Sequence, residues 1–142
     1  MNSNFKKIIY LLISIGIIIT LIYFIYKSCF ERTPASIVKK VFDVEVKKKN
    51  KLNVFKEQWD YNGNGYCLII FNNVDSDDIT MKYKVEKLPL RIELPPTEIT
   101  SILSNIQRGE YWVKFDSNDS RNLYLFVYDK IKRRAIFYYQ LF

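Results

Sequence analysis

The chain has 142 residues, of which 49% are hydrophobic and 16% aromatic, and its formal net charge at pH 7 is +7. This composition excludes a disordered polypeptide, and the length leaves room for one globular domain. The absence of histidine excludes Ser-His-Asp and Cys-His catalysis, histidine-ligated zinc and a histidine pH switch. Two cysteines, Cys29 and Cys67, are too few for a disulfide framework and leave the redox compartment open.

The first predicted element is a helix that crosses a membrane once. Residues 8–26 read IIYLLISIGIIITLIYFIY without a charge, and lysines lie on both sides of the run. As a helix this run spans about 28 Å, which matches the hydrocarbon core of a bilayer. It is longer than the apolar region of a cleaved signal peptide, which favours a signal anchor. A lipoprotein signal with an acylated Cys29 is the alternative, and the residues just before the cysteine fit it poorly.

The charges around this run favour two opposite orientations. The positive-inside count favours a cytoplasmic domain, because more Lys and Arg follow the run than precede it. A short basic N-terminus ahead of a long apolar run is typical of a signal anchor, and long domains cross membranes largely regardless of charge. We therefore predict a single-pass protein of the cell membrane with an extracytoplasmic domain. The predicted divisions are a cytoplasmic stub and anchor at 1–29, a juxtamembrane helix and basic linker at 30–50, and a globular domain at 51–142.

A short helix is predicted directly after the membrane, with Thr33 as its N-cap and Pro34 at its first position. Its apolar residues, from Ile37 to Phe42, fall on one side, so we expect it to lie between membrane and domain. Residues 47–50 are predicted to form a solvated connection. Juxtamembrane lysines are attracted to anionic lipid headgroups, each by about 1 kcal/mol. The lysines predicted to make this contact are Lys39, Lys40, Lys47, Lys48 and Lys49.

A β-hairpin is predicted from residues 52–61 and 66–72, which are joined by Asn62-Gly63-Asn64-Gly65. The second strand, YCLIIF, is apolar at consecutive positions, which predicts a central strand with both faces covered and a buried, unreactive Cys67. The turn also reproduces the opening D-x-N-x-N-G of a calcium loop from Asp60. The ninth and twelfth positions of that loop, Leu68 and Phe71, cannot bind calcium, so we interpret the segment as a turn.

The segment that follows is ambiguous. Residues 79–86 alternate between apolar and polar side chains, which predicts a strand with one wet face, and a helix capped at Ser76 or Asp77 is the alternative. Residues 88–94 continue as an extended run. Pro89, Pro95 and Pro96 make this run an edge strand or a connector.

The remaining elements are a second helix and three strands. Thr97 is predicted to cap the helix, whose apolar residues recur from Ile99 to Ile106 at helical spacing, and Gly109 is predicted to end it. Strands near 111–115, 123–128 and 135–142 read as an antiparallel meander. The predicted fold class is α+β: a transmembrane helix, then a small domain with a mainly antiparallel sheet and two short helices, which we expect on a single face of the sheet.

Motifs that carry chemistry are scarce. Two carboxylate pairs, Glu57 with Asp60 and Asp116 with Asp119, could act as a general acid and base, but any globular domain of this size contains such pairs. The sequence contains no glycine-rich phosphate loop and no CxxC motif. The basic run at 130–134 is interpreted as a solvated turn. We predict no enzyme activity, no cofactor, no metal and no nucleic-acid partner.

The aromatic surplus has two interpretations. These side chains fill a small core, or some of them form an exposed interface, where Tyr and Trp often anchor a partner. The interface candidates are Trp59, Tyr61, Tyr66, Trp112 and Tyr124.

We predict a non-catalytic binding module that engages a protein partner at the cell envelope. Its layout is similar to that of small anchored bacterial proteins, among them immunity proteins that neutralise a toxin at the envelope. The alternative is an accessory subunit of a membrane complex that acts through its transmembrane helix, where Ser14 and Gly16 form a small patch. The identity of the partner and the oligomeric state stay open.

Overall fold

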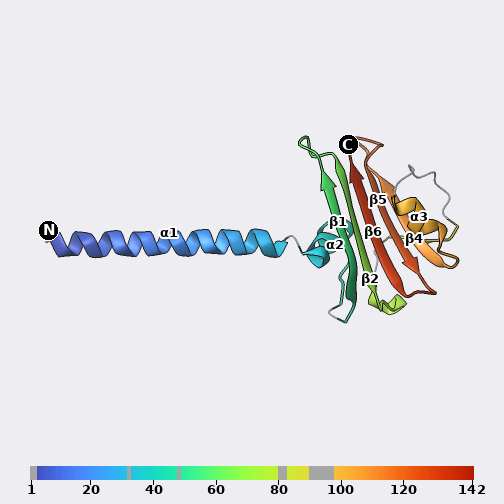
Figure 1. Ribbon diagram of the computed structural model, residues 1–142, viewed down its shortest axis with the longest axis horizontal. Coiled ribbons are helices and arrows are strands. Elements are labelled where there is room, and N and C mark those ends of the chain that lie inside the picture. The colour runs from blue at the N-terminus through green and yellow to red at the C-terminus, as the bar shows by residue number, and fades with distance from the viewer. Residues whose placement is uncertain (1–2, 32, 48, 80–82, 90–97) are drawn as a thin grey trace.

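A computed structural model describes residues 3–31, 33–47, 49–79, 83–89 and 98–142. The helices are α1 (Ser3–Glu31), α2 (Pro34–Phe42), the 3-10 helix η1 (Ser76–Asp78) and α3 (Glu98–Ser104). The strands are β1 (Lys51–Trp59), β2 (Gly65–Asn72), β3 (Glu86–Lys87), β4 (Gly109–Phe115), β5 (Leu123–Asp129) and β6 (Arg134–Leu141). Figure 1 shows an isolated N-terminal helix followed by a sheet with short helices. The predicted α+β class is confirmed.

The strands form a six-stranded sheet in the order β1-β2-β6-β5-β4-β3, and every neighbouring pair is antiparallel. The predicted hairpin is β1–β2, and the predicted meander is β4–β5–β6. Pairing of β2 with β6 joins these two units. The predicted central strand β2 therefore lies inside the sheet, and residues 67–71 are buried.

The turn between β1 and β2 is closed by its own side chain and by glycine. The Asp60 carboxylate accepts hydrogen bonds from the backbone N–H groups of Asn62 and Asn64, both at 2.8 Å. A Cβ atom at Gly65 would lie 1.9 Å from the carbonyl oxygen of Gln58, so no side chain fits there. The segment that resembles half a calcium loop is thus the predicted hairpin turn.

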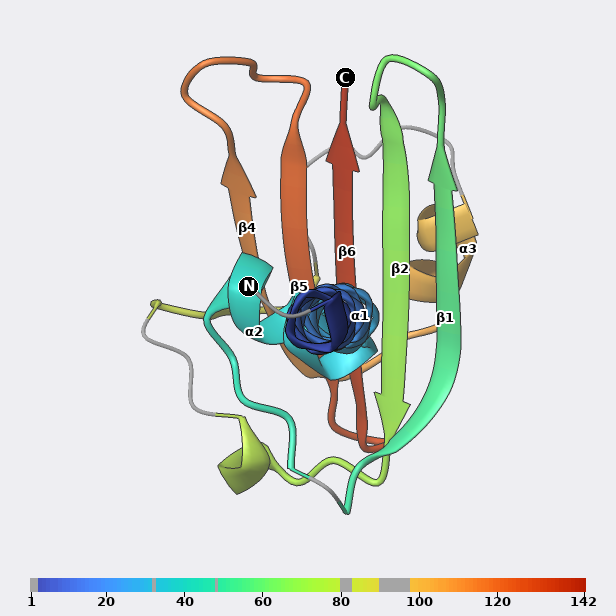
Figure 2. The same ribbon diagram turned by 90° about the vertical axis from the view of Figure 1, so that its left-hand side faces the viewer.

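The sheet separates two apolar clusters, one on each face. On the face that we call the α2 face, α2 and the following residues pack on side chains of β2, β5 and β6 that include Ile69, Phe126 and Phe137. On the opposite, α3 face, Ile99 packs with a set that includes Leu125 and Ile136. The expectation that both helices cover a single face is wrong. Because β2, β5 and β6 are apolar on both sides, each face needs its own cover, as Figure 2 shows.

Helix α2 forms as its sequence predicts. The hydroxyl of Thr33 accepts a hydrogen bond from the backbone N–H of Ser36, and Pro34 begins the helix. Ile37, Val38 and Phe42 are buried against the sheet. The Phe42 ring lies 5.2 Å from that of Phe137 and so packs directly on the sheet.

Helix α3 is shorter than predicted. It ends at Ser104, while Gly109 begins β4, so the prediction that Gly109 ends the helix is wrong. This glycine allows β4 to approach β5 closely, because a Cβ atom on it would lie 2.1 Å from the carbonyl oxygen of Tyr128. The predicted cap Thr97 lies outside the described residues.

The segment 79–86, for which we predicted a strand or a helix capped at Ser76 or Asp77, forms neither element at full length. A single turn of 3-10 helix, η1, begins at Ser76 with Asp75 as its N-cap, and the only strand residues described between 79 and 89 are Glu86 and Lys87 of β3. This two-residue strand pairs with β4 at the edge of the sheet. Residues 80–82 and 90–97 lie outside the described residues.

Helix α1 stands apart from the sheet. Its segment Ile9–Lys27 is long and apolar enough to cross a membrane, and none of it is buried against the rest of the chain. Figure 2 looks along α1 and shows the sheet face-on, with α2 between the helix and the sheet. The α2 face is therefore the one turned toward α1.

Candidate binding surface

The α2 face is only partly covered, because α2 has nine residues and leaves a hollow on each side. The hollow toward β1, which we call the β1-side hollow, has a volume of about 650 Å³, and the β4-side hollow has about 360 Å³. Lys40 and Val41 of α2 line both. Glu57, Trp59 and Tyr139 also line the β1-side hollow, and the β4-side hollow is also lined by Tyr83, Trp112, Lys114, Asp116 and Tyr124.

An aromatic row runs across this face beneath α2. The ring of Trp59 lies 5.5 Å from Tyr139, and Phe42 contacts both Tyr139 at 6.5 Å and Trp112 at 6.3 Å. Tyr83 stacks on Trp112 at 4.7 Å. One connected set of rings thus forms the bottom of both hollows and continues into the core.

The Cys67 thiol and the Tyr139 hydroxyl beneath the β1-side hollow stay protonated. Burial raises the pKa of the Cys67 thiol to about 12, and the nearby Glu57 carboxylate adds to the shift. Burial likewise raises the pKa of Tyr139. Cys67 is fully buried, as predicted, and its thiol is an unreactive part of the core.

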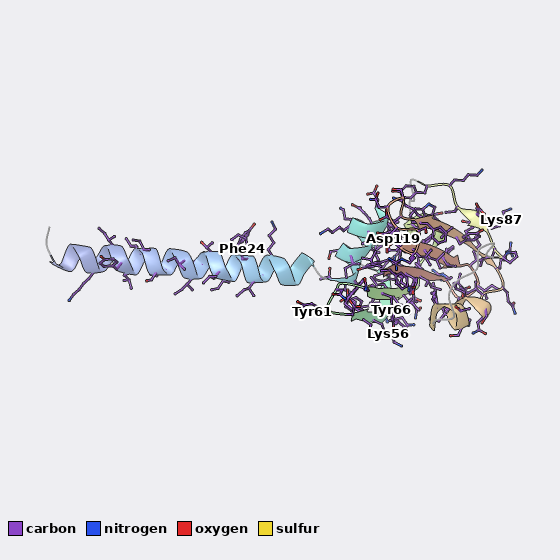
Figure 3. The ribbon with its side chains drawn as sticks, turned by 90° about the horizontal axis from the view of Figure 1, so that it is seen from above. Phe24, Lys56, Tyr61, Tyr66, Lys87 and Asp119 are labelled. Atoms are coloured by element: carbon purple, nitrogen blue, oxygen red, sulfur yellow. The ribbon has the colours of Figure 1, made fainter. Side chains whose placement is uncertain are left out.

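The five predicted interface residues separate into three groups. Trp59, Trp112 and Tyr124 lie on the α2 face. Tyr61 is fully exposed in the β1–β2 turn, and Tyr66 lies on the opposite face beside the Tyr138 ring, at 6.0 Å. Figure 3 shows Tyr61 at the side of the domain that faces α1.

Two further members of the row, Tyr139 and Tyr83, are not among the predicted residues. Tyr139 lies opposite Cys67 on β2 and Tyr124 on β5, and this strand register was the signal that places it on the same face. Tyr83 follows residues outside the described part of the chain, and its sequence neighbours give no signal for its stacking on Trp112.

A second surface lies along the edge strand β1. Among the described residues β1 pairs only with β2, and four large apolar side chains of this hairpin are exposed. The register shifts between Leu52 and Val54, which puts Leu52 and Phe55 on the same face of the sheet. We call the four residues the β1 edge: Leu52 (47% exposed), Phe55 (40%), Trp59 (38%) and Tyr61 (102%).

Most of the lysines predicted to meet lipid are engaged within the domain. Lys39 pairs with Glu45 at 2.6 Å, and Lys47 and Lys49 pair with Asp78 at 2.8 Å and 2.9 Å. These hydrogen-bonded ammonium groups lower the pKa of the buried Asp78 carboxyl. Lys47 and Lys49 therefore bind η1 and Asn50 is buried, so these residues do not form the simply solvated connection that we predicted.

Of the predicted lysines, Lys40 is exposed without an ion pair to a described residue, and Lys48 lies outside the described part of the chain. Whether any of these lysines meets lipid stays a prediction.

Three of the four carboxylates in the predicted pairs shape turns, whereas Glu57 lies on β1. Asp60 closes the β1–β2 turn, and Asp116 accepts a hydrogen bond from the backbone N–H of Asn118. Arg121 pairs with Asp119 at 2.7 Å and lowers the pKa of that carboxyl to about 2. Among the described residues, no group of three or more acidic or cysteine side chains is placed to hold a metal ion.

No family model matches the sequence, and no curated protein or solved structure is significantly similar to it. The function is therefore argued from the geometry of the α2 face and the β1 edge.

Proposed function

We propose that the chain is a single-pass, membrane-anchored binding module without catalytic activity that engages a protein partner at the cell envelope, with its domain outside the cytoplasm. The observation that carries this proposal is the β1 edge. In the described part of the chain beyond α1, eight large apolar side chains are exposed, and four of them lie on the β1–β2 hairpin. Clustering of this kind marks interaction sites, whereas single exposed apolar residues are ordinary.

The partner contact that fits this edge is the addition of a strand. An edge strand offers backbone N–H and C=O groups to another chain, and alternate side chains supply specificity. Beyond the bulge, Val54 to Trp59 pair with β2 in an unbroken register, so six residues offer a regular edge. Trp59 and Tyr61 are the residue types that most often dominate such interfaces.

Anchoring gives this module its place of action. A domain tethered by α1 is concentrated at the bilayer, so a partner that arrives there meets it at high effective concentration. This arrangement supports an immunity-like role, in which the module binds a protein that reaches the envelope. The absence of histidine and the use of acidic residues in turns support a role without catalysis.

The proposal is tested by photo-crosslinking in intact cells. A benzophenone amino acid replaces Phe55 on the β1 edge or, as a matched control, Ile131, which is 59% exposed in the β5–β6 turn. We expect a discrete adduct from position 55 and none from position 131. Failure of position 55 to form an adduct, or the same adduct from both positions, would count against a partner on this edge.

An accessory subunit that acts through α1 is the second candidate. Gly16 and Thr20 lie four residues apart, and the Thr20 hydroxyl donates to the Gly16 carbonyl oxygen at 2.8 Å. A glycine within a helix costs about 1 kcal/mol relative to alanine. No described atom lies within 4 Å of a Cβ at Gly16, so the fold itself does not require it. Small residues at this spacing allow two membrane helices to approach closely.

Exchange of residues 8–26 for an unrelated apolar helix of equal length separates the two candidates. The crosslink from position 55 should survive the exchange if the domain does the binding. Its loss would favour the accessory role of α1.

A further inference from the structure

We infer that the α2 face of the domain docks on the headgroup layer of the bilayer that α1 enters, and that zwitterionic phospholipid headgroups occupy the β1-side and β4-side hollows. This inference shares the membrane anchor, Trp59 and Tyr61 with the proposed function, but it needs no protein partner. It rests on the chain connection, on the chemistry of the hollows and on the balance of their charges.

The chain connection fixes the height of α2 above the membrane. Helix α1 ends at Glu31, five residues beyond Tyr26, which is the last residue of the uncharged run, and five helical residues rise about 8 Å. The headgroup layer of one leaflet is about 5–8 Å thick. Because only two residues separate Glu31 from Pro34, where α2 begins, α2 stands at the outer margin of that layer. Figures 1 and 2 show α2 between α1 and the sheet.

The hollows beside α2 carry the side chains that settle at membrane interfaces. Each contains one Trp with at least one Tyr, residue types whose apolar rings and polar tips suit the headgroup level. Tyr61, fully exposed, lies on the same side of the domain in Figure 3 and gives a further contact away from α2. In water the apolar parts of these rings would remain partly exposed to solvent, whereas the headgroup layer solvates both their apolar rings and their polar tips.

The charges of the hollows complement a headgroup that carries both signs. Lys40, shared by the hollows, offers an ammonium group for a lipid phosphate. In the β1-side hollow, the Glu57 carboxylate and the Trp59 and Tyr139 rings suit the ammonium of the same headgroup. Lys114 and Asp116 repeat this pairing in the β4-side hollow, where the Asp116 carboxylate also accepts from the Asn118 N–H.

This charge balance distinguishes the inference from ordinary attraction to anionic lipid. Two lysines, Lys40 and Lys114, face two carboxylates, Glu57 and Asp116, so the lining of the hollows carries no net charge. Lys39 is paired with Glu45, and Lys47 and Lys49 share the Asp78 carboxylate, so these three ammonium groups are engaged within the domain. Docking should therefore occur on purely zwitterionic vesicles and depend weakly on salt.

Fluorescence tests the inference, because Trp59 and Trp112 are the two tryptophans of the chain and each lines one hollow. The full chain is reconstituted in phosphatidylcholine vesicles as wild type and as the single-tryptophan variants Trp59→Phe and Trp112→Phe. A nitroxide is placed on the lipid headgroup or deep in the acyl chain. We expect the headgroup nitroxide to quench both tryptophans more strongly than the deep one, and aqueous iodide to quench them weakly.

Substitution of one cation sharpens the test. Lys40→Gln should reduce headgroup quenching of both tryptophans, while Lys132→Gln, at an exposed lysine outside both hollows, should leave it unchanged. Strong iodide quenching without nitroxide quenching would overturn the docking. Quenching that appears only when phosphatidylglycerol is added would overturn the zwitterionic occupant. Vesicles contain no protein partner, so either result leaves the crosslink from position 55 as a separate test of the proposed function.

Discussion

The two faces of the sheet are built from neighbouring residues and end up in different states. Ile136 and Phe137 are adjacent on β6, both are buried, and they belong to opposite clusters. On the α3 face the cluster is aliphatic apart from Tyr66, Tyr111 and Tyr138. On the α2 face a nine-residue helix covers the centre, and aromatic rings continue outward into two hollows. The aromatic residues of the α2 face are therefore divided between the core and the two hollows, which we propose as contact sites.

Removal of the central ring of the α2 face should have the largest effect. Phe42→Ala deletes a ring that is 1% exposed and contacts Phe137, Trp112 and Tyr139. We expect a loss of about 3–5 kcal/mol in the free energy of unfolding, measured by urea denaturation of the full chain in nanodiscs. The emission of both tryptophans should also shift, because α2 loses its anchor. A loss below about 1 kcal/mol would show that α2 is not part of the core.

The matching change on the opposite face is Ile99→Ala in α3. Ile99 is 1% exposed, so we expect a loss of about 2–4 kcal/mol by the same measurement. Tryptophan emission should stay as in the wild type under native conditions, since Trp59 and Trp112 lie across the sheet. If the emission shifted as in Phe42→Ala, the two faces would not be independent.

Asp78 provides a pH test of the segment that connects α2 to β1. Its pKa is lowered in the folded state, so its stabilising effect is complete well above the unfolded value of about 3.8 and is lost as the pH falls below it. Asp78→Asn should therefore lower the melting temperature at pH 7, with a difference from wild type that shrinks below pH 4. If the difference in melting temperature between Asp78→Asn and the wild type did not change with pH, the ion pairs with Lys47 and Lys49 would not be its cause.

The smallest expected effect is at the start of α2. Thr33→Ala removes the side chain that caps the Ser36 N–H and should cost about 1 kcal/mol in unfolding experiments. Thr33→Ser keeps the hydroxyl and should remain close to wild type. Equal losses in both variants would mean that the methyl group, and not the cap, stabilises the helix.

The elements that local patterns specify could be predicted from the sequence. Thr33-Pro34 specifies the start of α2, and the Asn-Gly residues after Asp60 specify the hairpin turn. The apolar run of β2 correctly indicated a strand covered on both faces. The placement of the helices on opposite faces follows from that same run, but it also required the pairing of β2 with β6, a contact between residues far apart in sequence. Gly109 illustrates the limit, since its clash partner Tyr128 belongs to another strand.

The candidate surface was predictable in part for the same reason. Composition pointed to Trp59, Trp112 and Tyr124, which do share the α2 face. Tyr66 lies on the other face because it is one residue out of phase with Cys67 in β2. The ion pairs that engage Lys47 and Lys49 join residues about thirty positions apart, and no local pattern announces them.

The most direct test of the account measures the distance of each face from the lipid. Ala35→Cys on α2 and Ser104→Cys on α3, both exposed positions, are labelled with a fluorinated probe in a Cys29→Ser background, where Cys67 stays buried. The full chain is placed in nanodiscs that carry gadolinium on some lipid headgroups. We expect strong relaxation enhancement at position 35 and weak enhancement at position 104. Equal enhancement at both positions, or stronger enhancement at position 104, would contradict it.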